Sequence, residues 1–246
     1  MNLLHHIGAY TLLMLRVFRL PEKASVFRKN VVYEMISIGI DSLGIIAIIS
    51  IFIGAVIVIQ TASNIESALI PLYAVGYTAR QSVILEFSPT IIALILAGKV
   101  GSSVASEIGT MRVTDQIDAL EIMGINSAGY LILPKVIAAV LINPFLILIS
   151  MFLAIGGGYL IGVSTGLVST YEFVYGIQYD FDPFGITYAL IKTVVFAFVI
   201  TSVPAYYGYY TKGGALEVGR SSTKAVVYSS IVILVLNYVL TQMLLV

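Results

Sequence analysis

The sequence predicts an all-α integral membrane protein with about five transmembrane helices. Hydrophobic residues make up 59% of its 246 residues and charged residues only 11%, whereas a soluble domain carries about 25% charged residues. The mean hydropathy is +1.01. Several apolar runs reach the roughly 20 residues that a helix needs to cross a bilayer. The net charge is zero, so nothing in the composition indicates a nucleic-acid partner.

Five segments are candidate spans because each is apolar over most of its length. They are 35–59, about 82–103, 130–163, about 185–207 and about 224–246. The third is long for a single span. Asn143 and Pro144 lie near its middle, which leaves open one tilted or bent helix or two shorter pieces.

The distribution of Lys and Arg predicts the orientation. With the N-terminus in the cytoplasm, eleven of the thirteen residues lie on the inner side, Arg80 lies outside, and Lys192 lies within the fourth span. Cytoplasmic loops of membrane proteins carry such an excess of positive charge. We therefore expect a multi-pass protein with a cytoplasmic N-terminus, and the segment 107–124 then lies in the cytoplasm.

The chain is expected to have two regions, 1–34 and a polytopic membrane domain over 35–246. The first region contains the apolar stretch LLHHIGAYTLLMLRVFRL (3–20), which includes two arginines and precedes a proline. It is short for a span and has no outer partner segment. We expect a helix lying in the inner membrane interface, with a sixth span as the alternative.

The segment EIGTMRVTDQIDALEIMG (107–124) concentrates charge between two apolar runs. Interpreted as one helix, it has an apolar arc and an opposite polar arc. The apolar arc holds Val113, Ile117, Leu120 and Met123, and the polar arc holds Thr114, Asp115, Asp118 and Glu121. Such a helix is too short and too charged to span. It is either a solvated loop helix or a docking helix for a soluble partner, and no histidine accompanies the carboxylates to make a metal site.

Ionisable residues at membrane depth are candidates for function. Glu86 and Lys192 both enter their spans from the outer side, so they either pair or face a shared polar cavity. Lys99 lies near the inner end of the second span and either reaches the headgroups or has a role within the membrane. The chain has no G-x-x-x-x-G-K-[ST] motif, so P-loop ATP hydrolysis would require a separate subunit.

A family resemblance rests on three stretches in order along the chain. They are EFSPTIIALILAGKVGSSVASEIGTMRVTDQIDALEIMG (86–124), IKTVVFAFVI (191–200) and GGALEVGRSSTKAVV (213–227). Together they resemble the MlaE/YrbE permease family of ABC transporters, and the resemblance covers most of the chain from about residue 30 onward. It implies an interfacial N-terminal helix, about five spans, a homodimer, and a cytoplasmic coupling helix at about 107–124 that contacts an ATPase.

The resemblance also implies a function. A permease of this family moves phospholipid or a related lipid between the bacterial inner membrane and a periplasmic MCE-type shuttle protein. The chain itself is then not an enzyme and holds no cofactor, because ATP and Mg²⁺ bind to the partner ATPase. Glu86, Lys99 and Lys192 become candidate residues of the lipid pathway. The alternatives are a gradient-driven secondary transporter or channel, and a membrane scaffold that transports nothing.

Overall fold

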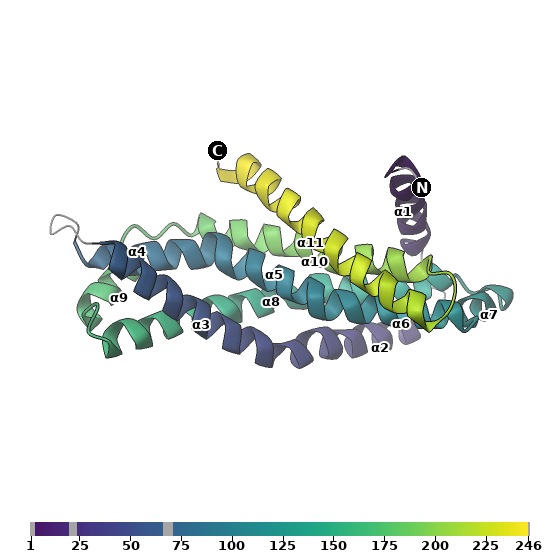
Figure 1. Cartoon of the computed structure of the whole chain (residues 1–246), viewed down its shortest axis with the longest axis horizontal. Coiled ribbons are helices and arrows are strands. Elements are labelled where there is room, and N and C mark those ends of the chain that lie inside the picture. The colour runs from purple at the N-terminus through teal and green to yellow at the C-terminus, as the bar shows by residue number, and fades with distance from the viewer. Residues whose placement is uncertain (1–2, 20–23, 66–70, 246) are drawn as a thin grey trace. The chain divides into compact units, whose positions relative to one another are not determined.

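The computed structural model describes residues 3–19, 24–65 and 71–245, which form helices joined by turns. No strand occurs in these ranges, and five helices in them are long and apolar enough to cross a membrane (Figure 1). They are Ala24–Asn64, Tyr73–Val113, Ser127–Ser164, Phe184–Tyr209 and Ala215–Leu245. The predicted fold class, an all-α membrane protein with about five spans, is confirmed.

The first two spans contain π-helical turns. The first consists of α2 (Ala24–Met35), η1 (Ile36–Ile40) and α3 (Asp41–Asn64), and the second of α4 (Tyr73–Ser82), η2 (Val83–Ile91), α5 (Ile92–Leu96), η3 (Ala97–Gly101) and α6 (Ser102–Val113). The turn η2 contains Pro89, which has no N–H to continue an α-helical ladder. Local π geometry is one way in which a membrane helix accommodates such a residue.

The other three spans are uninterrupted α-helices. They are α8 (Ser127–Ser164), α10 (Phe184–Tyr209) and α11 (Ala215–Leu245). The stretch 130–163 therefore forms one helix, and Asn143 and Pro144 do not divide it. The short helices are α1 (Leu3–Val17), α7 (Gln116–Ile122) and α9 (Thr170–Gln178).

The chain divides into two compact units. Unit 1 contains Met1–Asp41, Ala93–Asn143 and Val194–Val246, and unit 2 contains Ser42–Ile92 and Pro144–Thr193. The boundaries fall within the first four spans, so each of these helices contributes one part to each unit. The helix α11 belongs entirely to unit 1.

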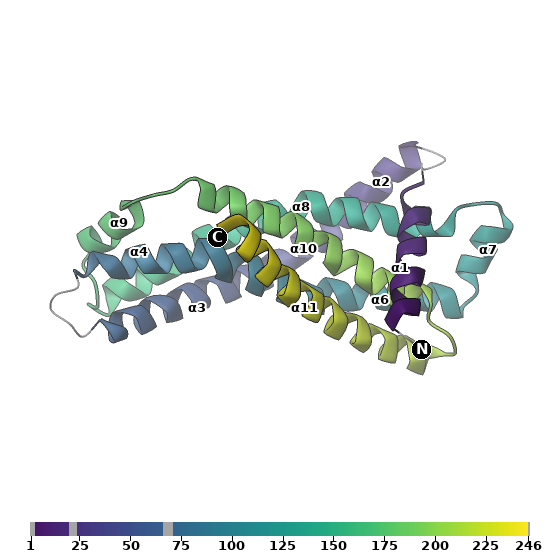
Figure 2. The same cartoon turned by 90° about the horizontal axis from the view of Figure 1, so that it is seen from above.

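The short helix α1 lies crosswise to its neighbouring helices of unit 1 in both views (Figures 1 and 2). One side packs inward, where Leu13 and Val17 are fully buried. The Tyr10 hydroxyl donates to Ser202 Oγ of α10 at 2.8 Å. The other side is apolar and exposed, with Leu4, Ile7, Leu12, Leu15 and Phe18. The crosswise helix α1 with its exposed apolar side is consistent with a position in the membrane interface. That position stays a prediction.

Small residues let the helices of unit 1 approach closely. A side chain at Gly208 of α10 would come within 2.8 Å of the Ala105 carbonyl oxygen of α6. A side chain at Gly109 would meet Val218 of α11 at 3.2 Å. Ser222 Oγ of α11 also donates to the Ser102 carbonyl at 3.1 Å. The second span and the last two spans are therefore packed together through backbone-level contacts within one chain.

In unit 2, α3 and α8 pack on each other through glycines. A Cβ added at Gly54 would overlap the backbone of Ala154, and one added at Gly157 would overlap the backbone of Ile51. Beside this contact Ser50 Oγ donates to Ser150 Oγ at 2.8 Å. Close backbone approach and buried hydroxyl bonds are two of the interactions that hold helices together in a membrane.

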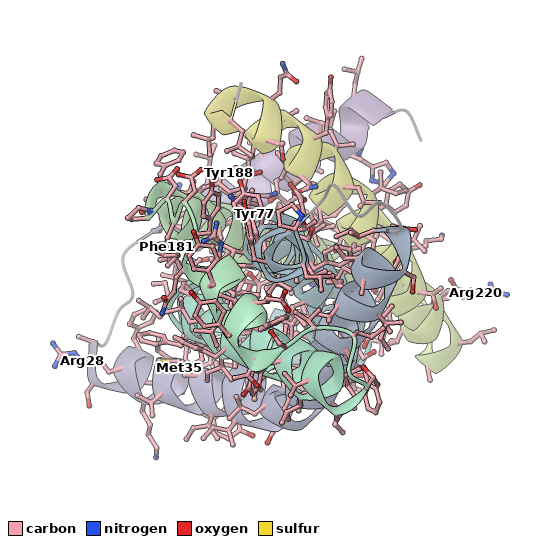
Figure 3. The ribbon with its side chains drawn as sticks, turned by 90° about the vertical axis from the view of Figure 1, so that its left-hand side faces the viewer. Arg28, Met35, Tyr77, Phe181, Tyr188 and Arg220 are labelled. Carbon is pink, nitrogen blue, oxygen red and sulfur yellow. The ribbon has the colours of Figure 1, made fainter. Side chains whose placement is uncertain are left out.

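The segment after α8 folds into α9, which Arg80 of α4 anchors. Ser169 and Glu172 form a capping box at the start of α9. At its other end the Arg80 guanidinium donates to the carbonyls of Ile177 at 2.7 Å and of Tyr179 at 3.0 Å. The rings of Tyr77 and Phe181, which Figure 3 labels, each lie within 5.4 Å of this guanidinium carbon, measured to the ring centroid. Arg80 is therefore 2% exposed and belongs to the packing of unit 2.

Candidate functional site

The charged segment 107–124 is two helices, not one. The helix α6 ends at Val113, Asp115 adopts a left-handed backbone with φ 58°, and α7 begins at Gln116. The expectation of one amphipathic helix over 107–124 is therefore wrong. The physical reason lies at the junction, where Thr114 Oγ1 donates to the Thr110 carbonyl and Asp is among the few residues that tolerate the left-handed region.

The break distributes the expected apolar arc between the core and the surface. Ile117 is fully buried, and Val113 and Leu120 are half-buried. Met123 is 65% exposed, and the neighbouring Ile122 is 87% exposed. The helical wheel placed Met123 beside Ile117 and did not single out Ile122. The pair Ile122 and Met123, here called the α7 tip, is an exposed apolar surface at the end of a short connecting helix.

The three carboxylates of the expected acidic stripe have different surroundings. Asp118 forms an ion pair with Arg112 at 2.6 Å. Glu121 accepts hydrogen bonds from Tyr209 and from Ser127, each at 2.9 Å. For the Asp115 carboxylate the described part of the chain provides no hydrogen bond or ion pair. The three carboxylates therefore do not form one uniform acidic stripe, and their contact with a partner stays a prediction.

Glu121 connects α7 to two membrane helices. The hydrogen bonds from Tyr209 and then from Ser127 hold the pKa of the Glu121 carboxyl below its usual value of 4.5. The hydroxyl oxygens of Ser127 and Tyr209 also lie 2.8 Å from each other. Since Ser127 begins α8 and Tyr209 ends α10, Glu121 links α7 directly to the ends of both helices.

A second cluster joins three helices near the same segment. The Lys135 ammonium of α8 lies 2.6 Å from a Glu34 carboxylate oxygen of α2 and 2.8 Å from a Glu107 oxygen of α6. The Lys135 side chain is only 4% exposed. A buried cation requires such partners, because its desolvation is costly without them. The sequence provided charges of both signs here but no signal for this grouping, because Glu34, Glu107 and Lys135 lie far apart in the chain.

In unit 2, Glu86 and Lys192 form an ion pair. Lys192 Nζ lies 2.9 Å from Glu86 Oε1, 2.8 Å from the Tyr188 hydroxyl and 3.2 Å from the Leu85 carbonyl. An ammonium has three protons to donate, and three acceptors surround this one. The Leu85 carbonyl lies four residues before Pro89, which has no N–H to bond it.

The two members of this pair differ in accessibility. The Lys192 side chain is fully buried, whereas the Glu86 side chain is 41% exposed. A polar group from outside the chain can therefore reach the Glu86 carboxylate but not the Lys192 ammonium. Sequence reasoning missed Tyr188, although its spacing of four residues before Lys192 places both on one helix face.

Lys99 has a separate environment in unit 1. It is exposed on η3, and its ammonium donates to the backbone carbonyl of Asp41. Of the expected lipid-pathway residues, Lys99 therefore belongs to unit 1, and Glu86 and Lys192 belong to unit 2.

The five spans, the interrupted charged segment and the buried ion pairs define a polytopic α-helical membrane protein with a small connecting helix between its second and third spans. The family model described as permease MlaE matches residues 31–243. The chain belongs to this family of ABC transporter permeases, and the resemblance of its three stretches is confirmed.

Three relatives illustrate the range of similar proteins. A probable ABC transporter permease protein of Rickettsia bellii is 36% identical, over 98% of this chain and 93% of that protein. The intermembrane phospholipid transport system permease protein MlaE of Haemophilus influenzae is 31% identical, over 85% of this chain and 80% of that protein. The chloroplastic protein TRIGALACTOSYLDIACYLGLYCEROL 1 of Arabidopsis thaliana is 32% identical, over 89% of this chain and 63% of that protein.

Proposed function

We propose that this chain is the membrane subunit of an ABC system that moves phospholipid or a related lipid between the bacterial inner membrane and a periplasmic shuttle protein. The observation that carries the proposal is the family match over residues 31–243 together with the Haemophilus relative, whose name states intermembrane phospholipid transport. In this proposal a periplasmic MCE-type protein exchanges the lipid, and the chain works as a homodimer with its N-terminus in the cytoplasm.

ATP and Mg²⁺ act in a separate subunit, because the chain contains no P-loop motif. The α7 tip is the proposed contact with that subunit. Ile122 and Met123 are large apolar side chains left exposed on a connecting helix, and such residues typically anchor a protein interface. Asp115 contributes charge at the opposite end of α7, at its junction with α6.

The proposed coupling route runs from α7 into the membrane helices. Movement of α7 would act on Ser127 and Tyr209 through the Glu121 carboxylate. The Lys135 ion pairs with Glu34 and Glu107 would carry the same movement to α2. Short connections through hydrogen-bonded groups of this kind allow a local displacement to bias a larger rearrangement.

A lipid pathway needs an apolar wall and a small number of polar groups for the headgroup. In the proposal Glu86 is such a polar group, because its carboxylate stays partly exposed while Tyr188 and Lys192 hold it in place. The expected role of Lys192 is to position Glu86, and Lys99 acts near the opposite end of its span. These roles remain proposals for all three residues.

Copurification of a co-expressed ATP-binding subunit tests the proposed contact. Converting Ile122 and Met123 together to Asp should reduce recovery of the ATPase about tenfold or more, because charges replace the apolar anchors. Leu120→Asp is a poorer test, since Leu120 is half-buried against the chain itself. Leu216→Asp is the matched control: Leu216 is 70% exposed and apolar, is the second residue of α11, and should tolerate the change with full recovery.

Two outcomes would contradict the proposal. Full ATPase recovery by a well-folded α7-tip variant would remove α7 as the coupling contact. Lipid transfer by the isolated chain in proteoliposomes, without any ATPase or ATP, would instead identify a gradient-driven transporter. A protein that neither binds an ATPase nor transfers lipid would instead support the alternative of a membrane scaffold.

A further inference from the structure

Unit 1 contains a cavity that the proposed transport mechanism does not use. It lies between α1, the end of α10 and the start of α11, and has a volume of about 490 Å³. Its lining comprises His5, His6, Ala9, Tyr206, Tyr207, Tyr210, Thr211, Lys212, Glu217, Arg220, Ser221 and Lys224. Polar and aromatic residues predominate in it, unlike the packed helix contacts elsewhere in the unit.

The charge in this cavity is unbalanced. Lys212, Arg220 and Lys224 contribute three cations, and Glu217 is the single carboxylate of the lining. Arg220 and Glu217 form an ion pair at 2.6 Å. Among the described residues no carboxylate pairs with Lys212 or Lys224. Two ammonium groups therefore face the cavity region without a counter-charge, which favours an anionic ligand.

Hydroxyls and a histidine complete the polar lining. The Tyr206 hydroxyl lies 2.8 Å from His6 Nδ1, which ties α1 to α10 at the cavity wall. Thr211 Oγ1 donates to Ser221 Oγ at 2.9 Å, which holds the start of α11 against the end of α10. Side-chain bonds therefore connect α1 to α10, and connect the turn after α10 to α11, at the cavity wall.

The two helices that line the cavity, α1 and α11, also carry exposed apolar side chains near the lining residues in the sequence. On α1, Leu4 is 81% exposed and Ile7 is 54% exposed. On α11, Leu216 and Tyr228 are also exposed. A soluble anion would leave these side chains in water, whereas an amphiphile would cover them with its acyl chains.

We propose that this cavity binds the phosphate headgroup of an anionic phospholipid, which stays bound as a structural ligand and is not the transported cargo. The cations and hydroxyls hold the phosphate, and the acyl chains lie along α1 and α11. Charge-assisted hydrogen bonds to phosphate are among the stronger polar contacts in proteins. The bound lipid would fasten α1 to the turn between α10 and α11. This inference does not depend on the proposed transport function.

Native mass spectrometry of the full chain tests the site. The purified protein is mixed with phosphatidylglycerol or with phosphatidylcholine, and bound lipid is counted. The variant with Lys212, Arg220 and Lys224 all changed to Gln should retain phosphatidylglycerol about tenfold less well, because it loses all three cations of the lining. Phosphatidylcholine binding should not change. The matched control changes Arg19, Arg28 and Lys29 to Gln, removing three exposed cations outside the cavity.

A second variant keeps the charges and fills the space. Ala9 lines the cavity from α1, so Ala9→Phe should also displace phosphatidylglycerol. Its melting temperature and that of the triple variant establish that each protein is folded.

The inference is overturned if the cavity triple variant retains lipid as the wild type does, or if the control triple variant loses it equally. It is also overturned if soluble glycerol phosphate binds the wild type as tightly as phosphatidylglycerol does. That result would assign the site to a free phosphate ester.

Discussion

The buried cationic side chains of this chain each donate to several hydrogen-bond acceptors. Lys192 has a carboxylate, a phenol and a backbone carbonyl, and Arg80 has the carbonyls that end α9. Lys135 has two carboxylates. Ionisable groups at membrane depth are expensive unless they are paired in this way. The arrangement therefore predicts that removing an acceptor harms the protein more than removing both charges together.

The Glu86–Lys192 pair allows a direct test. Glu86→Leu leaves the buried Lys192 ammonium without its carboxylate. It should lower the free energy of unfolding by about 3 kcal/mol or less, because solvent screens the partly exposed Glu86. Glu86→Gln keeps an acceptor and should cost less. The double variant Glu86→Leu with Lys192→Met should recover part of the loss. Melting temperatures in detergent measure this order, and a double variant less stable than Glu86→Leu alone would contradict it.

The Glu121 anchor predicts a dependence on acid. Because the folded pKa of Glu121 is lowered, its stabilising bonds are complete above the ordinary value of 4.5 and are lost as the pH falls through the lowered pKa. The chain has no cysteine, so Met123→Cys can carry a fluorophore that reports the environment of the α7 tip. Its emission should be constant above about pH 5 and change below pH 4.5.

Adding Glu121→Gln to the labelled chain provides the comparison. This variant lacks the titrating carboxylate and should show an altered signal at every pH with a smaller acid transition. An identical acid transition in both proteins would assign the change to another group.

Among the helices, close approach of backbones determines which contacts tolerate substitution. The α3–α8 contact in unit 2 depends on Gly54 and Gly157, where an added Cβ has no space. The same helix α8 carries Gly156, where an added Cβ would meet nothing within 4 Å. Neighbouring glycines in one run therefore have opposite requirements.

Alanine substitution separates these two kinds of glycine. Gly54→Ala forces α3 and α8 apart and should destabilise the protein by about 2 kcal/mol or more, since overpacked cores typically lose about 1–3 kcal/mol. Gly156→Ala should be neutral or raise stability by up to about 1 kcal/mol, because alanine favours a helix. Thermal unfolding of the two purified variants measures the difference. Equal stability would show that the α3–α8 contact is looser than the structure indicates.

For the whole molecule, the orientation prediction rests on the distribution of Lys and Arg. A labelling test needs exposed positions, and Ser127 and Thr211 are unsuitable because both are buried. Gln116 and Thr170 are exposed and have no side-chain bonds in the described structure. In intact cells, Thr170→Cys should react with an impermeant thiol reagent and Gln116→Cys should react only after lysis. Labelling of Gln116→Cys alone would reverse the orientation.

The sequence was sufficient for the properties that depend on composition and on runs of neighbouring residues. Hydrophobic stretches define spans, because a bilayer requires about 20 apolar residues whatever their neighbours are. The five spans and the family were therefore predictable, and so was the existence of a charged segment near 107–124. The pairing of Glu86 with Lys192 was one of two alternatives, since both enter their spans from the same side.

Only the tertiary structure decided how distant residues meet. The helical wheel assumed a continuous helix over 107–124, but Thr114 and Asp115 interrupt it, and Ile122 rather than Leu120 becomes the most exposed apolar residue. The partners of Lys135 and Glu121 lie on other helices, at separations that no local pattern encodes. The cavity beside α1 likewise combines residues from both ends of the chain. Local pattern determines which segments are helical and apolar, whereas side-chain partners depend on packing between helices, which follows from the shapes of whole surfaces.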